Sequence, residues 1–378
     1  MKYFFLLLLT YISLSANSQN DNWYPFEVGE EENALIGYKD VEGNVMIKPR
    51  FKGFLMSRVP FTDIIAVEEE VETERIAYYL SKDGQKFGQD SMYVFDMAFD
   101  CEREGFIRFQ PDGWDRTGLF NRKGEIVIPP DYNYISEVNN GLVFALKDAR
   151  KEYWDKNHDE NGGCDHWSWV DGIECLLDTA NNVLIENFKY NPHHDFHSIR
   201  VEDVPSTDTL RDSYLGVNGK YYTFINNEKA FKYWFFNEFL KDLSEDRLKR
   251  NSFKYISWQD NLNFGVAQNE EFIDANYELI KDRISEILRD DCEYFMSLDG
   301  YLNSRVEYDN GYSFDDYFDN CGNLKFHRYP KFDIIVNYLY KNEVIKYQDH
   351  FNFLKTDGEY KLIGLTLREA DFEILNDQ

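Results

Sequence analysis

The chain has 378 residues, of which 43% are hydrophobic and 17% aromatic, and its formal net charge at pH 7 is −28. This length is sufficient for two domains, each with a core of its own. The strong negative charge argues against nucleic acids and anionic membrane surfaces as partners, because both are recognised through basic patches.

The first residues have the pattern of a secretory signal. Lys2 precedes an apolar run over residues 4–9, and the small residues Ala16 and Ser18 fit a cleavage site. The alternative is a membrane anchor, but the run is shorter than the roughly 20 apolar residues that span a bilayer. No later stretch is apolar enough to span a bilayer. We therefore predict a signal peptide over residues 1–18 and an exported protein, located in the periplasm, on the cell surface or outside the cell.

Two segments that follow, residues 37–51 and 118–132, match each other in register. Their turn glycines, Gly43 and Gly124, are separated by twice about 40 residues, and a middle copy is expected at Gly84. A fourth copy is expected over residues 175–185, with Asn182 in place of the turn glycine. We predict a β-rich N-terminal repeat array of about four hairpin units over residues 19–204, propeller-like or solenoid-like in form.

The repeated pattern, a glycine followed by an aromatic residue or Leu, then a turn glycine, Ile, Pro and Phe or Tyr, resembles the WG-repeat (WG-containing repeat) family over roughly residues 33–200. The match is most specific at residues 129–132. Ile36 and Thr117 stand where the family has tryptophan. The resemblance implies a β-repeat scaffold that binds other molecules and has no shared catalytic residues.

An insertion at residues 148–172 interrupts the repeats, and long insertions often carry function. Asp155, Asn157, Asp159 and Asn161 alternate oxygen ligands, as a calcium loop requires, although Glu160 stands at the position of the usual glycine. A transition-metal site is a second reading, because five histidines lie between residues 158 and 197. These are His158, His166, His193, His194 and His197. The third reading is a solvated polar loop with Trp167 and Trp169 packed inward.

The chain has five cysteines, and export permits disulfides. We expect the pairs Cys164–Cys175 and Cys292–Cys321 first, because each lies within one predicted domain. At least one thiol must stay free or pair between chains, because the number is odd. Cys101 is the cysteine that these two pairs leave over.

Residues 205–378 are predicted to form a separate α+β domain of two helices followed by an antiparallel sheet. One helix is expected after a cap at Asn226 or Asn227, and another over residues 269–290. The expected strands cover residues 305–308, 324–327, 332–340, 344–347, 351–355 and 360–367. The closing hairpin around Thr356 and Gly358 is similar to the end of cone-shaped NTF2-like domains.

The sequence has no nucleophile elbow, phosphate-binding loop, zinc-protease motif or dinucleotide fingerprint. An acidic run of Asp309, Asp315, Asp316 and Asp319 lies among tyrosines, and paired carboxylates are the groups used in glycoside hydrolysis. Runs of this kind also arise by chance in a chain as acidic and aromatic as this one.

We expect an exported, non-catalytic binding or interaction protein built on a β-repeat scaffold, with a protein or carbohydrate ligand and no nucleic acid partner. The alternative function is that of a hydrolase or small-ligand-binding protein that uses a pocket in the C-terminal α+β domain. No cofactor is assigned, and calcium at residues 155–161 is the alternative.

Overall fold

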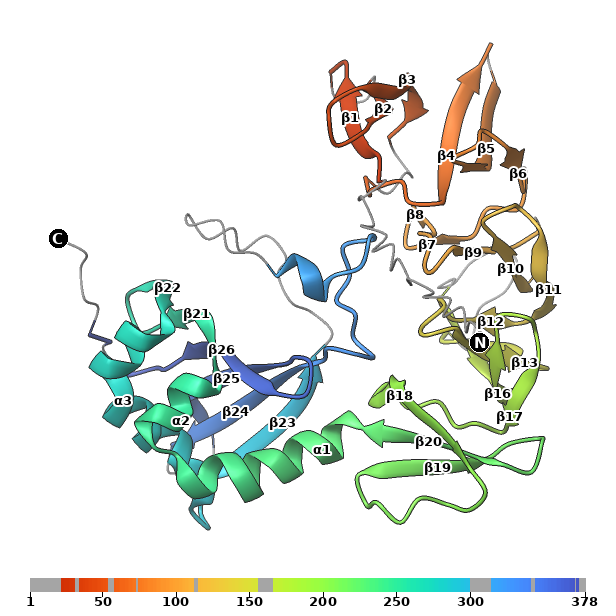
Figure 1. Cartoon of the computed structure of the whole chain (residues 1–378). Helices are drawn as coiled ribbons and strands as arrows, with labels where there is room; N and C mark the ends of the chain where they lie inside the picture. The colour runs from red at the N-terminus through yellow and green to blue at the C-terminus, as the bar shows by residue number, and fades with distance from the viewer. Residues whose placement is uncertain are drawn as a thin grey trace, which may run out of the picture.

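The computed structural model describes residues 22–30, 34–53, 58–72, 74–111, 115–155, 166–299, 314–340, 344–370 and 372–373. It is rich in strands, which form many small antiparallel sheets (Figure 1). The expected signal peptide lies outside the described residues. No helix among those residues has the length and apolar character needed to cross a membrane.

The first sheet contains six strands that are neighbours in chain order. Its core is apolar and aromatic, with Tyr38, Phe51 and Phe61 fully buried. The strands are β1 (Tyr24–Val28), β2 (Leu35–Lys39), β3 (Val45–Lys52), β4 (Ile64–Val71), β5 (Glu74–Ser81) and β6 (Lys86–Phe87).

Smaller sheets follow and continue the strand-rich region down one side of the molecule (Figure 1). They comprise β7 (Val94–Phe95) with β8 (Ala98–Phe99), and β9 (Phe106–Phe109) with β10 (Thr117–Asn121) and β11 (Ile126–Tyr132). Next come β12 (Tyr134–Ile135), β13 (Leu142–Lys147), β16 (Ile173–Asp178) and β17 (Val183–Glu186). The last sheet holds β18 (His194–Glu202), β19 (Arg211–Leu215) and β20 (Tyr221–Asn226), so strand pairing of this kind continues past residue 204.

Five hairpins in this region close on the same five-residue turn. The N–H of the first residue donates to the carbonyl of the fifth, and the N–H of the fourth donates to the carbonyl of the first. The fourth residue has a positive φ, which favours glycine or asparagine. The turns cover residues 40–44, 81–85, 121–125, 178–182 and 216–220.

The turn glycines Gly43, Gly84 and Gly124 stand where the sequence predicts them. In the fourth turn, Asn181 has the positive φ, of 64°, and the prediction of Asn182 is wrong by one residue. The reason is that Asp178 opens this turn and accepts N–H groups from Ala180 and Asn182, which places Asn182 at the fifth position.

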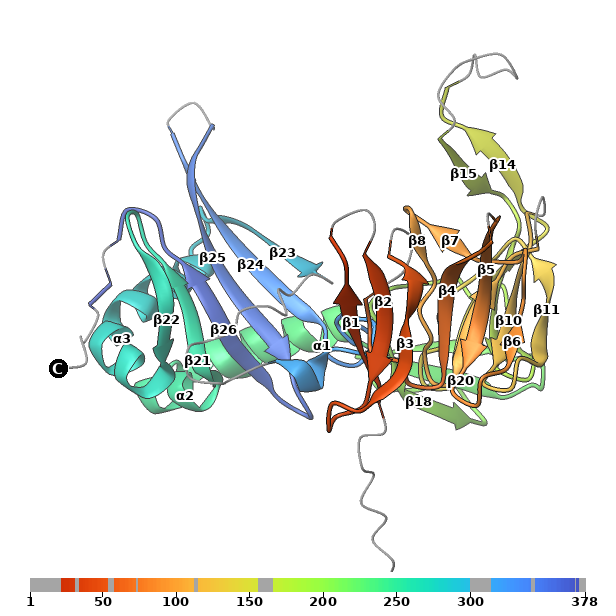
Figure 2. The same cartoon turned by 90° about the horizontal axis from the view of Figure 1, so that it is seen from above.

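The insertion is a two-stranded arm, formed by β14 (Arg150–Tyr153) and β15 (Trp167–Val170), that extends away from the other sheets (Figure 2). The prediction that Trp167 and Trp169 pack inward is wrong. Their ring centroids are 4.7 Å apart and the Lys151 ammonium lies over both rings, because β15 pairs only with β14. Trp167 is 36% exposed.

The C-terminal part combines helices with a second six-stranded sheet in the order β22-β21-β26-β25-β24-β23. The helical elements are α1 (Asn227–Trp234), which continues as η2 (Phe235–Phe239) and η3 (Leu240–Asp242), then α2 (Glu245–Arg250), α3 (Asn269–Ser285), η4 (Glu286–Leu288) and η5 (Asp315–Tyr317). The strands are β21 (Ser252–Gln259), β22 (Phe264–Gln268), β23 (Glu293–Asp299), β24 (Lys331–Leu339), β25 (Ile345–Lys355) and β26 (Tyr360–Thr366).

The two predicted helices are present. Asn226 caps α1 by accepting the N–H of Lys229 at 3.1 Å, as expected. The expected strands 344–347 and 351–355 form one continuous strand, β25. Residues 324–327 form no strand, and Leu324 makes an isolated bridge to Phe318. The expected strand 305–308 lies outside the described residues, and the prediction did not include β21, which pairs in parallel with β26.

One face of this sheet packs against the helices through a large aromatic core. Successive residues of a strand point to opposite faces, so β25 turns Phe351 and Phe353 toward the helices and His350 and Asn352 away from them. The ring of Phe231 on α1 stacks on Phe332 of β24 at 4.0 Å. Burial of aromatic rings on this scale is the main force that joins helices and sheet.

Candidate functional site at the junction of the two parts

Residues 314–330, here called the docking segment, precede β24 and lie between the C-terminal sheet and the strand-rich region (Figure 1). Phe314, Phe318 and Tyr329 of this segment belong to an apolar cluster with Leu354 and Ile363. Leu354 and Ile363 follow directly on Phe353 and Leu362, which face the helices, so the segment covers one part of the other face of the sheet.

The docking segment contains the same turn as the five hairpins. Asp319 donates its N–H to the carbonyl of Asn323 and accepts the N–H groups of Cys321 and Asn323 at 2.8 and 3.0 Å on its carboxylate. Gly322, the fourth residue, has a φ of 76°. This turn places Cys321 and Asn320 toward the strand-rich region.

A disulfide joins Cys321 to Cys101, which lies between β8 and β9. The predicted pairs Cys292–Cys321 and Cys164–Cys175 are therefore wrong, because Cys292 and Cys175 are free. Cys164 lies outside the described residues. The prediction paired cysteines within one predicted domain, whereas the docking segment brings together two from different parts of the chain, 220 residues apart.

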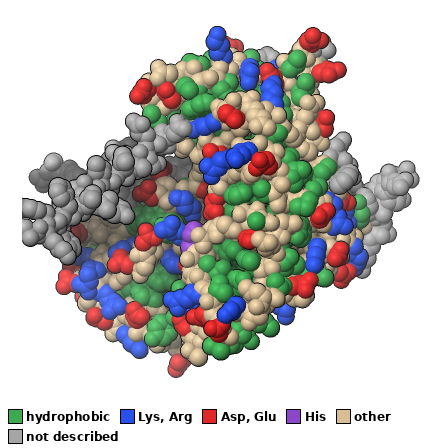
Figure 3. All heavy atoms as spheres, turned by 45° about the vertical axis from the view of Figure 1, so that its right-hand side comes forward, with side chains coloured by type: hydrophobic (Ala, Val, Ile, Leu, Met, Phe, Trp, Pro, Cys, Tyr) green, Lys and Arg blue, Asp and Glu red, His purple; other side chains and the backbone are tan. Residues whose placement is uncertain are grey.

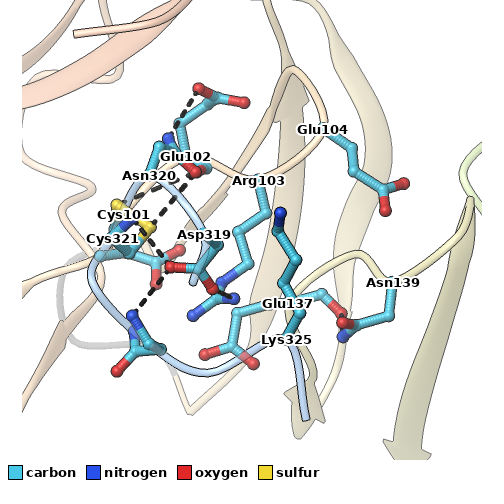
Figure 4. A network of polar contacts seen from close by, with 12 residues as sticks. Cys101, Glu102, Arg103, Glu104, Glu137, Asn139, Asp319, Asn320, Cys321 and Lys325 are labelled. Atoms are coloured by element: carbon cyan, nitrogen blue, oxygen red, sulfur yellow. Dashed lines mark hydrogen bonds and ion pairs between the residues drawn. A yellow bond between two sulfur atoms is a disulfide. The ribbon is translucent and has the colours of Figure 1, made fainter. Parts of the chain in front are cut away.

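Polar contacts surround the disulfide (Figure 4). The Arg103 guanidinium forms an ion pair with Asp319, and their side chains are 16% and 12% exposed. The Asn320 amide donates to the Thr62 hydroxyl and to the carbonyl of Glu102, both at 2.9 Å. The Glu102 side chain accepts the N–H of Gly105, and burial raises the pKa of its carboxyl.

A cleft of about 300 Å³ lies next to this network. The strand-rich region supplies Arg103, Glu104, Val138, Asn139 and His197 to its lining, and the docking segment supplies Phe318, Asp319, Asn320, Lys325 and Arg328. Figure 4 shows the disulfide and Asp319 on one side of the network and Glu104 and Asn139 on the other. The cleft is thus built from both parts of the chain.

The charged groups of the cleft differ in how they are neutralised. Glu104 accepts the N–H groups of Asn140 and Gly141 at 2.7 and 2.9 Å. Arg328 pairs with Asp357 at 3.1 Å. The Lys325 ammonium donates to the carbonyl of Asp316 at 2.9 Å, and it forms no ion pair with any carboxylate in the described part of the chain.

His197 and His327 lie at this junction, where His327 is half-buried and His197 is exposed at its edge. Burial lowers the pKa of both imidazoles, so their neutral forms are favoured at pH 7. His327 stacks on Phe196 at 4.4 Å, and its Nδ1 lies 3.0 Å from the carbonyl oxygen of His194. These contacts hold the end of the docking segment against β18.

A second ion pair joins the two parts near the start of α1. The Lys355 ammonium on β25 lies 2.7 Å from Asp195 of β18 and 2.8 Å from the side-chain oxygen of Asn227. The side chains of Lys355 and Asp195 are only 15% and 10% exposed, so water screens this pair weakly.

The structure places the residues predicted to bind metal only in part, and of these His197 lines the cleft. Of the calcium set, the structure describes only Asp155, and Asn157, Asp159 and Asn161 lie outside the described residues. In the described part of the whole chain, no group of three or more His, Cys, Asp or Glu side chains is arranged to hold a metal ion. His194 contacts Asp212 and His193 contacts Glu228.

The acidic run is placed in part. Asp309 lies outside the described residues, Asp315 and Asp316 belong to η5, and Asp319 lines the cleft. The carboxylate of Asp319 is paired with Arg103, which is not the arrangement of two facing carboxyl groups that glycoside hydrolysis uses. Sequence reasoning missed Arg103, Glu104 and Lys325, although the Asp-x-x-Gly-Asn turn at residues 319–323 could have marked the segment.

Comparison with known proteins gives one result. The WG containing repeat family model matches residues 118–150, which include β10, β11 and β13, in agreement with the resemblance read from the sequence. No curated protein and no solved structure matches the chain, and nothing in these comparisons supports an NTF2-like C-terminal part.

Proposed function

We propose that the chain is an exported, non-catalytic binding protein in which a β-repeat scaffold and the docking segment together form a ligand site. The observation that carries this proposal is the cleft at the junction, whose two walls are held by the Cys101–Cys321 disulfide and the Arg103–Asp319 ion pair. A site that is fixed before the ligand arrives loses less conformational entropy on binding.

The repeat interpretation rests on the five hairpins that share one turn and on the family match at residues 118–150. We propose that the array extends through β20 to residue 226, because β19 and β20 pair with β18. On this proposal the C-terminal α+β domain begins with α1, at Asn227.

For the C-terminal domain we retain the NTF2-like fold as a proposal. Its support is a six-stranded sheet that packs one face on α1 and α3 and ends with the β25–β26 hairpin. The space between helices and sheet is filled by aromatic rings, including Phe235 and Phe351, which favours a structural role for that interior.

The lining of the cleft favours a small polar ligand with both donors and acceptors. Arg103, Lys325 and Arg328 bring positive charge, Glu104 and Asp319 bring negative charge, and Asn139 and Asn320 bring amides. Figure 3 shows that basic and acidic side chains are mixed over one face of the molecule. A saccharide of one or two rings or a short peptide has matching groups, and about 300 Å³ is at the lower end of ligand-site volumes.

Binding can be tested by measuring the melting temperature and calorimetric binding of the mature protein with a panel of mono- and disaccharides and short peptides. A ligand of the folded state raises the melting temperature. Lys325→Gln removes the cleft cation that lacks a carboxylate partner, and we expect it to weaken binding of the ligand found by about tenfold, the effect of losing one charged hydrogen bond. Lys123→Gln, in the exposed turn of the β10–β11 hairpin, is the matched control.

The proposal fails if no member of the panel binds, or if Lys325→Gln and Lys123→Gln leave the affinity equally unchanged. Export is tested separately, by N-terminal sequencing of the protein from its native compartment. We expect a start near residue 19, and the disulfide supports export because oxidised pairs are rare in the cytosol.

A further inference from the structure

The face of the C-terminal sheet opposite the helices carries a row of polar and small residues that crosses five strands. Ser297 pairs with Asp333, Asp333 with Asn352, Asn352 with Gly364, and Gly364 with Ser257. A Cβ at residue 364 would lie 2.4 Å from the hydroxyl oxygen of Ser257, so only glycine leaves room for the neighbouring side chains of this row. Polar residues alone are normal on a solvated sheet face, so the row needs further evidence before it indicates a site.

That evidence is a histidine held in one orientation. Nδ1 of His350 lies 3.2 Å from Oδ2 of Asp333, and Oδ1 of Asp333 accepts a hydrogen bond from the Asn352 amide at 2.9 Å. A carboxylate can only accept, so Nδ1 of the neutral imidazole carries the proton and Nε2 presents a lone pair. Within the described residues Nε2 has no hydrogen-bond partner.

A pocket of about 470 Å³ adjoins this histidine and is separate from the junction cleft. His350, Gln348, Thr366, Asn261, Tyr340 and Arg368 are among the residues that line it. The pocket therefore offers an imidazole acceptor, two amides, a hydroxyl, an aromatic ring and a guanidinium on one surface.

The guanidinium of Arg368 is the group that indicates the charge of the ligand. Its one hydrogen bond is from Nη1 to the carbonyl of Asp260 at 3.3 Å, and in the described part of the chain no carboxylate forms an ion pair with it. The other cation, Lys346, is neutralised by Glu369 at 2.7 Å. In a chain with a net charge of −28, an arginine without a carboxylate partner in a pocket is a specific place for an anion.

We propose that this pocket binds a small polyhydroxylated carboxylate, a sugar acid in chemical class. Arg368 binds the carboxylate, Nε2 of His350 accepts a hydrogen bond from a hydroxyl group, and Gln348, Asn261 and Thr366 satisfy the remaining hydroxyls. The Asp333 carboxylate acts through His350 by fixing its tautomer and ring orientation, so Asp333 is a positioning residue. This site goes beyond the junction cleft and does not depend on it.

The test is calorimetric titration of the mature protein with three probes, galacturonate, galactose and succinate. Galacturonate is expected to bind, galactose to bind at least tenfold more weakly because it lacks the carboxylate, and succinate more weakly because it lacks hydroxyls. Arg368→Gln is expected to weaken galacturonate binding at least tenfold without changing galactose binding. His350→Gln is expected to weaken binding of both sugars.

Two controls make the result specific. His193→Gln changes another histidine paired with a carboxylate, Glu228, and is expected to keep galacturonate affinity. Lys325→Gln changes the junction cleft, and it distinguishes binding there from binding in the pocket at His350. In long-range ¹H–¹⁵N spectra of histidine side chains, galacturonate is expected to shift Nε2 of His350 in the parent protein and much less in Asp333→Asn. The proposal is overturned if no probe binds at millimolar concentration, if galactose binds as well as galacturonate, or if Arg368→Gln and His350→Gln leave the affinity unchanged. Loss of binding in Lys325→Gln instead would assign the ligand to the junction cleft.

Discussion

Cys101 and Cys321 are 220 residues apart in the chain, and their disulfide joins the strand-rich region to the docking segment of the C-terminal part. The two cysteines meet because the turn at residues 319–323 presents Cys321 and Asn320 to the loop that carries Cys101 and Glu102. The disulfide therefore holds the docking segment against the strand-rich region, and it also closes a loop of the chain between residues 101 and 321.

Removal of this disulfide should destabilise the junction. The cross-link closes a long loop and so lowers the conformational entropy of the unfolded chain. We therefore expect Cys101→Ser with Cys321→Ser to lower the free energy of unfolding by about 2–5 kcal/mol. Denaturant unfolding measures this cost, and limited proteolysis should cut the docking segment faster in the double variant. Cys292→Ser changes a free cysteine and is the control. Equal protease resistance of parent and double variant would contradict the role of the disulfide.

The buried ion pair of Arg108 and Asp100 should contribute more than any exposed pair. Nη2 and Nε of Arg108 lie 2.5 and 3.1 Å from the two oxygens of Asp100, and the side chains are 8% and 6% exposed. Asp100→Ala leaves the guanidinium buried without its main partner, at an expected cost of about 3–5 kcal/mol.

The matched comparison is the pair of Arg150 and Asp171 on the arm, where the distance is 2.7 Å and both side chains are at least 60% exposed. Asp171→Asn should cost less than about 1 kcal/mol, because water screens the exposed pair and asparagine tolerates the positive φ of 59° at this position. Urea unfolding of both variants gives the comparison. Similar costs for the two substitutions would show that burial does not decide the strength of these pairs.

The turns could be predicted from sequence because the glycine at the fourth position of each turn is a local requirement. Gly43, Gly84 and Gly124 recur at a spacing near 40 residues, and Gly219 continues the pattern in a hairpin that was not predicted. The prediction missed that hairpin because Gly216 stands at its first position, where the other turns have Asp, Ser or Asn. Helix α1 was predicted for the same kind of reason, since its cap at Asn226 is also local.

The candidate site could not be predicted in this way. Arg103 and Asp319 are 216 residues apart, and their ion pair exists only because the docking segment lies against the strand-rich region. No local pattern in a single sequence indicates a contact between residues so far apart. The cysteine pairing failed for the same reason, since membership of one predicted domain was the only guide.

The junction should be less stable in mild acid. Burial lowers the folded-state pKa of His194, His197 and His327 below the ordinary value of 6.5, so between these values the unfolded chain binds more protons than the folded one. The contribution of these histidines to the free energy of unfolding is then complete above pH 6.5. It falls as the pH drops below this value, by at most about 1.4 kcal/mol per pH unit for each histidine.

Glu102 and Asp349, a buried residue of β25, act in the opposite direction, because burial raises the pKa of both carboxyls and protonation then favours the folded state. The histidine contribution is therefore measured as a difference between variants. In urea unfolding at pH 7.5 and 5.5, His327→Gln should lose less stability on acidification than the parent protein. His166→Gln, at the exposed far end of the arm beside Trp154, should behave as the parent. An unchanged pH dependence in His327→Gln would exclude the His327 imidazole as a source of this effect.

Two turn glycines with the same backbone conformation should differ in their tolerance of alanine. Gly43 and Gly124 have φ values of 88° and 72°, and each substitution places an L-residue in the left-handed region at a cost of about 1–2 kcal/mol. At Gly43 a new Cβ has no atom within 4 Å, whereas at Gly124 it would lie 2.7 Å from Cγ of Phe87.

Phe87 cannot easily yield, because its ring packs against Tyr79 and Phe120 at 5.7 and 5.2 Å. We therefore expect Gly124→Ala to cost about 1–3 kcal/mol more than Gly43→Ala, as overpacking does in a well-filled core. Urea unfolding of the two single variants measures the difference. Equal costs would mean that Phe87 moves freely, and the turns would then serve to reverse the chain without also packing one hairpin against the next.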